Sequence, residues 1–400
     1  MKILLVTDAY SHLMNGVAMV VSTLSESYRK MGHDVRVLTI SGDCKSHCEN
    51  GVYYLPSYNL PIYPDFRISI AHGHPYLKIL KEWKPDIVHI HSEASASILA
   101  KSVAKSTNAP IIMTWHTDYA KFAFHEYHSL AAVEFAAREL MKIAYHGACM
   151  ITVPSFKAKK LLDGYSVKFP NTIIPNGISL DKFYRDVTDE EKKALREKYN
   201  IAEDKKILVI LARLSPEKNI GELLEYFPEL LKHDPKLHLL IAGIGPDKER
   251  LESLSSKLGI DDNVTFTGFV QPEDTYLYYK LGIAFLSAST FEMHSLTYLE
   301  ALACGLPLVC RNDLCLKGVL DDGVNGYIYD DKDEFVEKML KLLNNESLRK
   351  QMSEKALERS ALFGNEAFAK NMLNLYYNIL YVKNRNYRKK LMSLKNKDNK

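Results

Sequence analysis

The sequence contains no run of apolar residues that approaches the roughly 18 to 20 consecutive residues of a membrane-spanning helix. The apolar run within residues 1–10 is too short for a secretory signal and is typical of a first β-strand. The six cysteines are scattered through apparent strands, helices and loops, which argues against a disulfide framework. From these absences we expect a protein of the reducing cytoplasm.

The length and composition predict a folded protein with more than one domain. With 400 residues the chain is too long for one typical core. A composition of 46% apolar and 25% charged residues is ordinary for a soluble globular protein and excludes a disordered one. Short apolar runs alternate with helical patterns, which is typical of parallel sheets covered by helices on both faces. We therefore predict the α/β class.

The predicted strands fall into two series, separated by a polar helix that a capping box opens at Thr188 and Glu191. The first series comprises residues 3–7, 35–40, 52–55, 87–90, 111–113, 150–153 and 172–174, and the second comprises residues 207–211, 237–242, 264–266, 283–286 and 308–310. These series predict two doubly wound sheets with a boundary near residues 176–204. Helical patterns at residues 332–343, 346–362 and 365–380 follow the second series.

The segment TFEMHSLTYLEALACGLP at residues 290–307, where a strand turns into a helix, carries two glutamates eight positions apart. If the segment were helical throughout, its rise of about 1.5 Å per residue would separate Glu292 from Glu300 by roughly 12 Å, the reach from a sugar across a diphosphate to a ribose. The free backbone N–H groups of the first turn, Met293 to Leu296, would then point at the phosphates. Taken alone, the pattern fits an exposed helix with two solvated glutamates equally well.

A second segment, residues 211–220, carries Arg213 and Lys218 between the strand at 207–211 and a helix at 220–232. It therefore lies at the carboxyl edge of a sheet, where open α/β sheets bind ligands. The arginine fork and the lysine ammonium would together neutralise a diphosphate leaving group as its charge develops. Taken alone, either cation is better explained as a solvated residue of an exposed loop.

Together, the two segments resemble the donor site of the retaining glycosyltransferases of family four, which have the GT-B fold. The resemblance extends over residues 1–380, and further motifs follow in the family's order: NGV at 15–17, TWHTDY at 114–119, VPS at 153–155, IPNGI at 174–178 and IAGIGP at 241–246. It implies two Rossmann-like domains facing across a cleft, with the last helix crossing back to the first domain. We predict an N-terminal acceptor domain at 1–180, a nucleotide-sugar domain at 200–365, a crossover helix at 366–380 and a basic tail at 381–400.

The resemblance also implies roles for individual residues. His116 would lie beside the transferred sugar, and Gly16 would come close to the diphosphate. The implied catalytic residues are Glu292, His116, Arg213 and Lys218, and the implied donor-binding residues are Gly16, Arg213, Lys218, Gly245, Met293, His294, Ser295, Leu296 and Glu300. Position 295 is serine where many relatives have glycine, so either its backbone avoids positive φ or it lies farther from the donor.

The residues Asp-Lys-Asp at 331–333 match the Asp-x-Asp motif of metal-dependent glycosyltransferases of another fold. Here it precedes a predicted helix, and we expect it to cap that helix. We therefore expect no metal and no cofactor besides the nucleotide-sugar substrate. The positive charge at the diphosphate would come from Arg213, Lys218 and backbone dipoles.

Basic character is concentrated in residues 381–400, whose eight Lys or Arg and one Asp give a net charge of +7 and leave −4 on the rest of the chain. Such a tail would either bind anionic lipid headgroups or remain a solvated terminus. Residues 75–84 form an apolar helical stripe of Tyr76, Leu80 and Trp83 flanked by lysines, a pattern that more often packs on its own sheet than on a membrane. Residues 60–67, LPIYPDFR, look like the Tyr-Pro-Glu-Tyr-Arg segment of bacterial diacylglycerol glucosyltransferases.

Our first hypothesis is a peripheral enzyme at the inner face of the cell membrane that moves a hexose, glucose from UDP-glucose, to a diacylglycerol-type lipid with retention. The candidate acceptor-side or membrane-side residues are Tyr63, Arg67, Lys78, Lys81, Trp83 and Asp118. The alternative acceptor is a saccharide of a cell-surface polymer. A nucleotide-sugar epimerase and a non-catalytic binder are disfavoured by the Glu-x7-Glu segment and by the intact Arg213, Lys218, Glu292 and Glu300 set. We expect no nucleic-acid partner.

Overall fold

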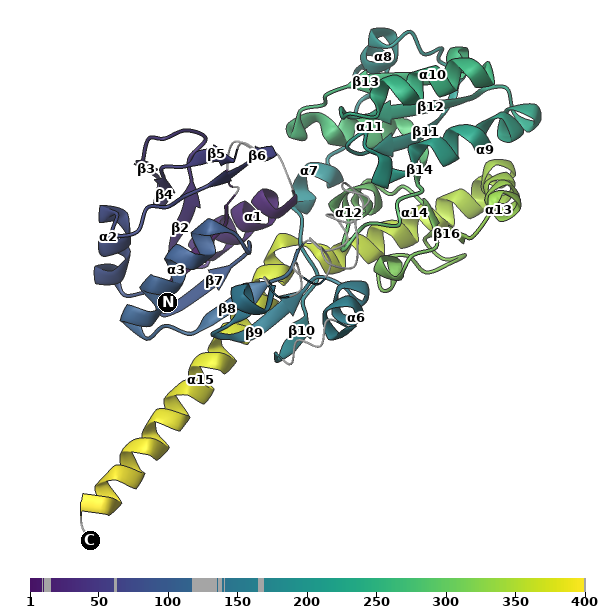
Figure 1. Ribbon diagram of the computed structural model, residues 1–400. Helices are drawn as coiled ribbons and strands as arrows, with labels where there is room; N and C mark the ends of the chain where they lie inside the picture. The colour runs from purple at the N-terminus through teal and green to yellow at the C-terminus, as the bar shows by residue number, and fades with distance from the viewer. Residues whose placement is uncertain are drawn as a thin grey trace. The chain divides into compact units, whose positions relative to one another are not determined.

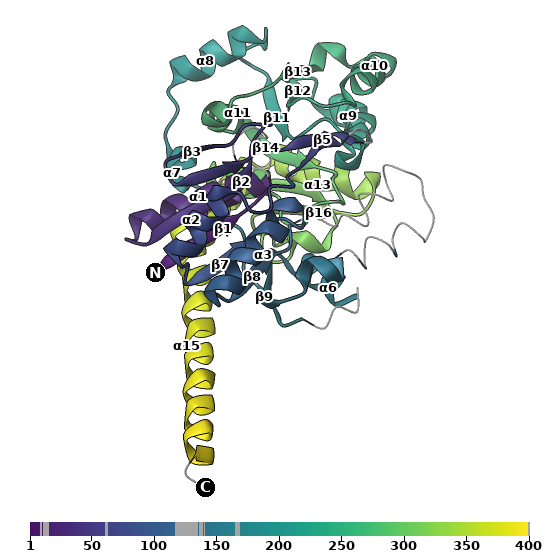
Figure 2. The ribbon, with the colours of Figure 1, turned by 60° about the vertical axis from the view of Figure 1, so that its left-hand side comes forward.

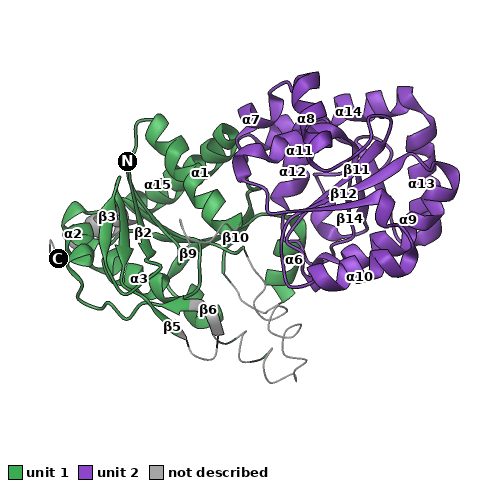
Figure 3. Ribbon diagram, turned by 90° about the horizontal axis from the view of Figure 1, so that it is seen from above, with its two compact units in different colours: residues 1–177, 365–400 green, residues 178–364 purple. Residues whose placement is uncertain are grey.

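The computed structural model describes residues 1–8, 10, 16–60, 63–116, 135, 139, 141–164 and 169–398, without the side chains of 60, 63–66 and 386–398. The chain forms two compact units (Figure 3). Unit 1 comprises Met1–Gly177 and Asn365–Lys400, and unit 2 comprises Ile178–Gly364. The chain therefore leaves unit 1 after Gly177 and returns to it with its last helix.

Unit 1 contains an eight-stranded sheet in the order β10-β9-β8-β7-β1-β2-β4-β3, parallel except for the β3–β4 pair. Its strands are β1 (Lys2–Val6), β2 (Asp34–Ile40), β3 (His47–Glu49), β4 (Val52–Leu55), β7 (Ile87–Ile90), β8 (Ile111–Thr114), β9 (Ala148–Val153) and β10 (Asn171–Ile173). Unit 1 also contains a separate hairpin of β5 (Tyr58–Leu60) and β6 (Tyr63–Ile68), which the sequence analysis did not predict. Pro64 lies inside β6, and a proline within a run argues against a strand except at a sheet edge.

Among the described residues, the helices of unit 1 with given bounds are α1 (Gly16–Lys30), α2 (Pro75–Trp83), α3 (Ser95–Thr107), α6 (Phe156–Gly164) and α15 (Asn365–Asp398). The first turns of α15 pack on α1 and the sheet through Phe368, Met372 and Tyr376, so the last helix crosses back to the first unit as expected. This helix also continues through the predicted tail and ends at Asp398 rather than near residue 380 (Figures 1 and 2). The buried pattern ends earlier, but the segment holds no glycine or proline to stop a helix. None of the described helices is long and apolar enough to cross a membrane.

Unit 2 contains a six-stranded parallel sheet in the order β13-β12-β11-β14-β15-β16. Its strands are β11 (Lys206–Leu211), β12 (Leu237–Ala242), β13 (Val264–Gly268), β14 (Gly282–Ser287), β15 (Leu308–Arg311) and β16 (Gly326–Tyr329), of which the short β16 was not predicted. Its helices are α7 (Leu180–Tyr184), α8 (Asp189–Lys198), α9 (Ile220–His233), α10 (Lys248–Leu258), α11 (Thr275–Leu281), α12 (Leu296–Ala303), α13 (Lys332–Asn344) and α14 (Glu346–Ser360).

The side chains of successive residues of β11 are buried on opposite faces of this sheet. Val209 belongs to one apolar core with residues of α11 and α12, whereas Leu208 and Ile210 belong to a second core with residues of α9 and α13. A strand buried on both faces is the arrangement expected for a parallel sheet between two helical layers. The prediction of an α/β protein with two doubly wound sheets is thereby confirmed.

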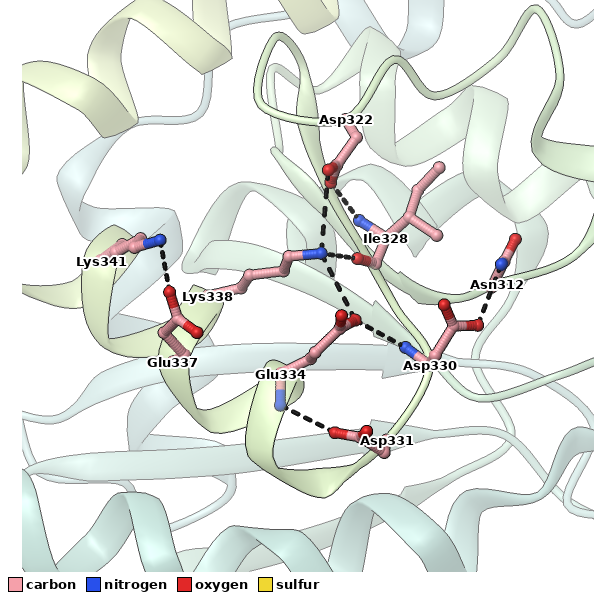
Figure 4. A network of polar contacts seen from close by, with 9 residues as sticks. All are labelled: Asn312, Asp322, Ile328, Asp330, Asp331, Glu334, Glu337, Lys338 and Lys341. Carbon is pink, nitrogen blue, oxygen red and sulfur yellow. Dashed lines mark hydrogen bonds and ion pairs between the residues drawn. The ribbon is translucent and has the colours of Figure 1, made fainter.

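Two predicted helix caps are also confirmed. Thr188 and Glu191 form the reciprocal capping box at the start of α8. Asp331 caps α13, because its carboxylate accepts a hydrogen bond from the backbone N–H of Glu334 at 3.0 Å (Figure 4). In the same network Lys338 donates to the Ile328 carbonyl oxygen. The Asp-x-Asp spelling is therefore explained by the folding of α13.

Candidate functional site

Unit 2 brings Lys218 and Glu292 together at the carboxyl edge of its sheet. Lys218 ends the short 3₁₀ turn Pro216–Lys218 after β11, and Glu292 follows β14, which pairs with β11. The Nζ of Lys218 donates a hydrogen bond to Glu292 Oε1 and forms an ion pair with it. The two segments that the sequence predicted to share a site therefore meet through their charged side chains.

The cations of this loop stand in different surroundings. Burial lowers the pKa of Lys218, but the charge of Glu292, its hydrogen bond and the charge of Glu217 outweigh burial and raise that pKa above its usual value. Lys218 is therefore held in its charged form. Arg213 is exposed and has no hydrogen-bond or ion-pair acceptor among the residues that the structure describes. Its guanidinium is available to an anion.

The Glu-x7-Glu segment is not helical throughout, so the expected separation of roughly 12 Å along one helix does not apply. Helix α12 begins only at Leu296, with Ser295 as its N-cap, and Glu292 precedes it. Within the described part of the chain, the backbone N–H groups from Met293 to Leu296 have no protein acceptor. Ser295 has φ −73°, outside the left-handed region, so serine occupies this position without strain.

Glu300 is buried inside α12 and accepts a hydrogen bond from the hydroxyl of Tyr279 at 2.9 Å. Burial raises the pKa of Glu300 to about 6, against the opposing effects of the Tyr279 hydrogen bond and the Lys182 charge. His294 is also buried, and burial lowers its pKa to about 4. Its Nδ1 atom has no hydrogen-bond partner among the described residues. The segment thus presents a buried carboxylate and a neutral imidazole.

The glycines of the 241–246 loop, among them the donor-binding candidate Gly245, lie directly against the backbone of a neighbouring loop. A Cβ on Gly243 would lie 1.9 Å from the Ala212 carbonyl oxygen, and one on Gly245 would lie 2.1 Å from that of Leu214. The backbone N–H of Leu214 donates to Ile244 at 2.9 Å. Gly243 and Gly245 therefore let this loop pack directly on the backbone of the loop that carries Arg213.

In unit 1, His116 follows β8 and contacts a histidine that the sequence analysis did not single out. His91 Nδ1 lies 3.0 Å from His116 Nε2, and burial lowers the pKa of His116 to about 4. Gly16 begins α1 and is exposed. Asp118 lies outside the described residues.

Glu93 is a second group that the sequence analysis missed. It accepts a hydrogen bond from the hydroxyl of the buried Tyr145, and burial, with a smaller effect of the Asp8 charge, raises its pKa to about 8. The available signal was the alternation of His89, His91 and Glu93 from within a buried strand into the loop that follows it.

The membrane-side role predicted for Trp83 is wrong. Trp83 is buried, donates from its indole N–H to Asp34 at 2.8 Å, and packs its ring under Arg36 at 4.5 Å. The stripe on α2 therefore packs inward, and Lys78 is exposed while Lys81 is half-buried. Trp83 was assigned to the membrane side because helical spacing alone does not show whether an apolar face packs on the protein's own sheet or on another surface.

Arg67 holds the β5–β6 hairpin together. Its guanidinium donates to the hydroxyl and carbonyl oxygens of Ser57 at 2.7 and 2.8 Å and to the side chain of Asn59. These bonds give Arg67 a structural purpose inside unit 1. The side chain of Tyr63 lies outside the described residues.

Both units match known family models. Residues 14–182 match the model described as Glycosyltransferase Family 4, and residues 191–359 match the one described as Glycosyl transferases group 1. The chain is 32% identical to an alpha-monoglucosyldiacylglycerol synthase of Acholeplasma laidlawii, over 98% of this chain and 100% of that protein. It is also 32% identical to an alpha-monoglucosyldiacylglycerol synthase of Streptococcus pneumoniae, over 96% of this chain and 87% of that protein.

Solved structures share the fold at lower sequence identity. Sucrose-phosphate synthase from Thermosynechococcus elongatus superposes with a TM-score of 0.76 at 20% identity, covering 95% of this chain and 99% of that one. The Anabaena protein HepE in complex with UDP-glucose superposes with a TM-score of 0.72 at 16% identity, covering 94% and 99%. The two Rossmann-like units are thus those of the GT-B fold.

Proposed function

Because this chain belongs to glycosyltransferase family 4 and is a hexosyltransferase, we propose that it moves glucose from UDP-glucose to a diacylglycerol-type membrane lipid with retention of configuration. The two relatives at 32% identity, named as glucosyldiacylglycerol synthases, support the lipid acceptor. The fold neighbour in complex with UDP-glucose supports the donor.

The observation that carries the proposal is the Lys218–Glu292 pair, whose lysine shares the strand-to-helix loop after β11 with the exposed Arg213. As the bond between sugar and diphosphate breaks, negative charge develops on the leaving group. An arginine fork and an ammonium fixed in place stabilise that charge, and they cost no reorganisation at the moment of reaction. Glu292 orients Lys218 and lies at the side of the site where we place the transferred sugar.

Glu300 and the start of α12 complete the donor site in this proposal. The Glu300 carboxylate accepts from ribose hydroxyls, while the Tyr279 hydroxyl holds one of its oxygens. The backbone N–H groups from Met293 to Leu296 donate to phosphate oxygens at the positive end of the helix dipole. His116 contacts the transferred sugar as a neutral imidazole, because its pKa of about 4 keeps it uncharged near pH 7.

The acceptor requires the enzyme to work at a membrane surface. We place it in the cytoplasm, bound peripherally to the inner face of the cell membrane through the basic end of α15. Lys78, on α2, is exposed and provides a second cationic contact.

The test is to incubate the purified protein with labelled UDP-glucose, with and without diacylglycerol vesicles, and to identify the products. We expect an α-linked glucosyl-diacylglycerol. Lys218→Ala should strongly slow its formation, and Lys257→Ala, at an exposed site on α10, should leave it unchanged. Transfer only to an added saccharide would support the cell-surface polymer alternative. An epimerised nucleotide-sugar without transfer would overturn the proposal.

A further inference from the structure

Three histidines lie together at the ends of two neighbouring strands of unit 1. His89 is in β7, His91 follows that strand, and His116 follows the adjacent β8. The rings of His89 and His91 are 4.0 Å apart between centroids, and those of His91 and His116 are stacked at 5.3 Å with an interplanar angle of 21°. Alternate residues of a strand project to the same face, which explains why His89 and His91 meet.

The three histidine rings are uncharged, and His91 and His116 are hydrogen-bonded to each other. Burial lowers the pKa of His89 to about 3 and that of His116 to about 4, and burial, His89 and His116 hold the pKa of His91 well below its usual value. All three rings are therefore neutral near pH 7. In the 3.0 Å contact between His91 Nδ1 and His116 Nε2, one nitrogen must carry a hydrogen and the other must accept it.

The surroundings of His91 favour one of the two arrangements. His91 is 1% exposed, and its Nε2 atom has no hydrogen-bond partner in the described part of the protein. A proton on Nε2 would leave a buried donor unpaired, which is rarer in proteins than a buried acceptor without a donor. A proton on Nδ1 instead donates to His116 Nε2. His116 then carries its own proton on Nδ1.

We propose that His91 is a positioning residue, which orients the His116 ring and keeps its proton on Nδ1 so that His116 offers an N–H donor to a hydroxyl of the transferred sugar. The proposal rests on the proposed function, in which His116 contacts that sugar. Oxygen atoms of a hexose hydroxyl accept such a bond, whereas a bare Nδ1 would only accept. The tautomer thus decides which hydrogen bond the sugar receives.

His89, which packs against the ring of His91, is itself held by buried hydrogen bonds. His89 Nδ1 is 2.5 Å from the hydroxyl of Tyr376 in α15, and His89 Nε2 is 2.7 Å from that of Thr114 in β8. Tyr376 also accepts from Tyr28 at 3.2 Å. With both nitrogens bonded, the His89 ring has a fixed orientation and supports the face of His91. The C-terminal helix therefore contributes to the position of His116 through Tyr376.

The tautomer is tested directly by two-bond ¹H–¹⁵N spectra of ¹⁵N-histidine protein, with the His116 signals assigned from their loss in His116→Ala. We expect His116 protonated on Nδ1 and His91 likewise. Observation of His116 protonated on Nε2 in the wild-type protein would overturn the proposal, whatever the activity. This measurement needs no variant at the buried His91.

Kinetics test the positioning role. His91→Leu removes the donor and should lower kcat about tenfold with little change in KM for the donor, whereas His91→Asn places an amide N–H near the position of Nδ1 and should restore most of the loss. The double variant His91→Leu/His116→Ala should lose no more than His116→Ala alone. Additive losses would show that His91 acts independently and would contradict the proposal. If His116→Ala alone left transfer intact, the proposed role of His116 would fail, while the tautomer spectra would still decide the position of the proton.

Discussion

The ammonium of Lys218 is hydrogen-bonded to the carboxylate of Glu292, across 74 positions of sequence. Each residue belongs to a different strand-to-helix segment, and each side chain is largely buried. The pair keeps Lys218 charged and fixes it at the edge of the sheet before any substrate arrives. Preorganised charge of this kind is the largest single contribution in many enzymes that stabilise a leaving group.

Removing this charge should impair turnover. Lys218→Ala is expected to lower kcat/KM by about 10² to 10³, the effect of deleting one preorganised stabilising group. It also removes the ion pair with Glu292, so the melting temperature should be measured beside the kinetics. Lys257→Ala, on the exposed face of α10, is the matched control. A folded Lys218→Ala protein with normal kcat/KM would remove Lys218 from the site.

The affinity for UDP should depend on the protonation of Glu300. Its raised pKa of about 6 means that the carboxylate is mostly ionised at pH 7.5 and mostly protonated at pH 5. A protonated carboxyl accepts fewer hydrogen bonds, so UDP should bind more weakly as the pH falls through about 6. UDP affinities should be measured by calorimetry for the wild-type protein and for Glu300→Gln at each pH. Protonation of the UDP phosphate affects both proteins equally, so the difference between them reports on Glu300. We expect the two affinities to converge at pH 5, and parallel pH profiles would argue against a ribose contact by Glu300.

The polar chain inside unit 1 should contribute to stability. Tyr376→Phe removes a hydroxyl that both His89 and Tyr28 use, and each buried group left unsatisfied costs about 1 to 3 kcal/mol. We expect a clear fall in melting temperature. Tyr377→Phe, at the neighbouring position that is 52% exposed, should change it little. Equal melting temperatures for the two variants would show that the chain adds no stability.

The packing of the glycine loop should be intolerant of a methyl group. In Gly245→Ala the new Cβ would meet the Leu214 carbonyl oxygen at 2.1 Å, so the loop that carries Arg213 must shift, at a cost of about 1 to 3 kcal/mol. We expect a lower melting temperature and weaker UDP binding. Gly164→Ala is the control, because its Cβ would meet nothing within 4 Å. If Gly245→Ala bound UDP with unchanged affinity, this loop would not contribute to the donor site.

The basic end of α15 should bind anionic membranes. Deleting residues 386–400 removes six Lys or Arg and one Asp but keeps Lys383, whose ammonium donates to the Asn108 carbonyl oxygen. At about 1 kcal/mol per cation near the surface, the truncated protein should sediment much less with anionic vesicles at low salt. The difference should shrink at high salt, since screening shortens the reach of the charges, and neutral vesicles serve as the control. Failure of the full-length protein to bind anionic vesicles would favour the saccharide acceptor.

Local patterns were sufficient to predict most of the strands, the capping of α8 and α13, and the two segments that carry Arg213, Lys218, Glu292 and Glu300. Apolar periodicity and caps depend on residues within a few positions of one another, so they can be read along the chain. The resemblance of those segments to a known donor site added the expected chemistry.

Contacts between distant residues decided the rest. Trp83 faces inward, where it contacts Asp34 and Arg36 of β2, whereas the pattern of residues 75–84 only favoured this orientation over a membrane-facing one. Helix α12 starts at Leu296 because the chain must first leave β14 and place Glu292 against Lys218. The pairing of His91 with His116 likewise depends on the adjacency of β7 and β8. Sheet order and the packing of loops on one another bring these side chains together, and both arise only when the whole chain has folded.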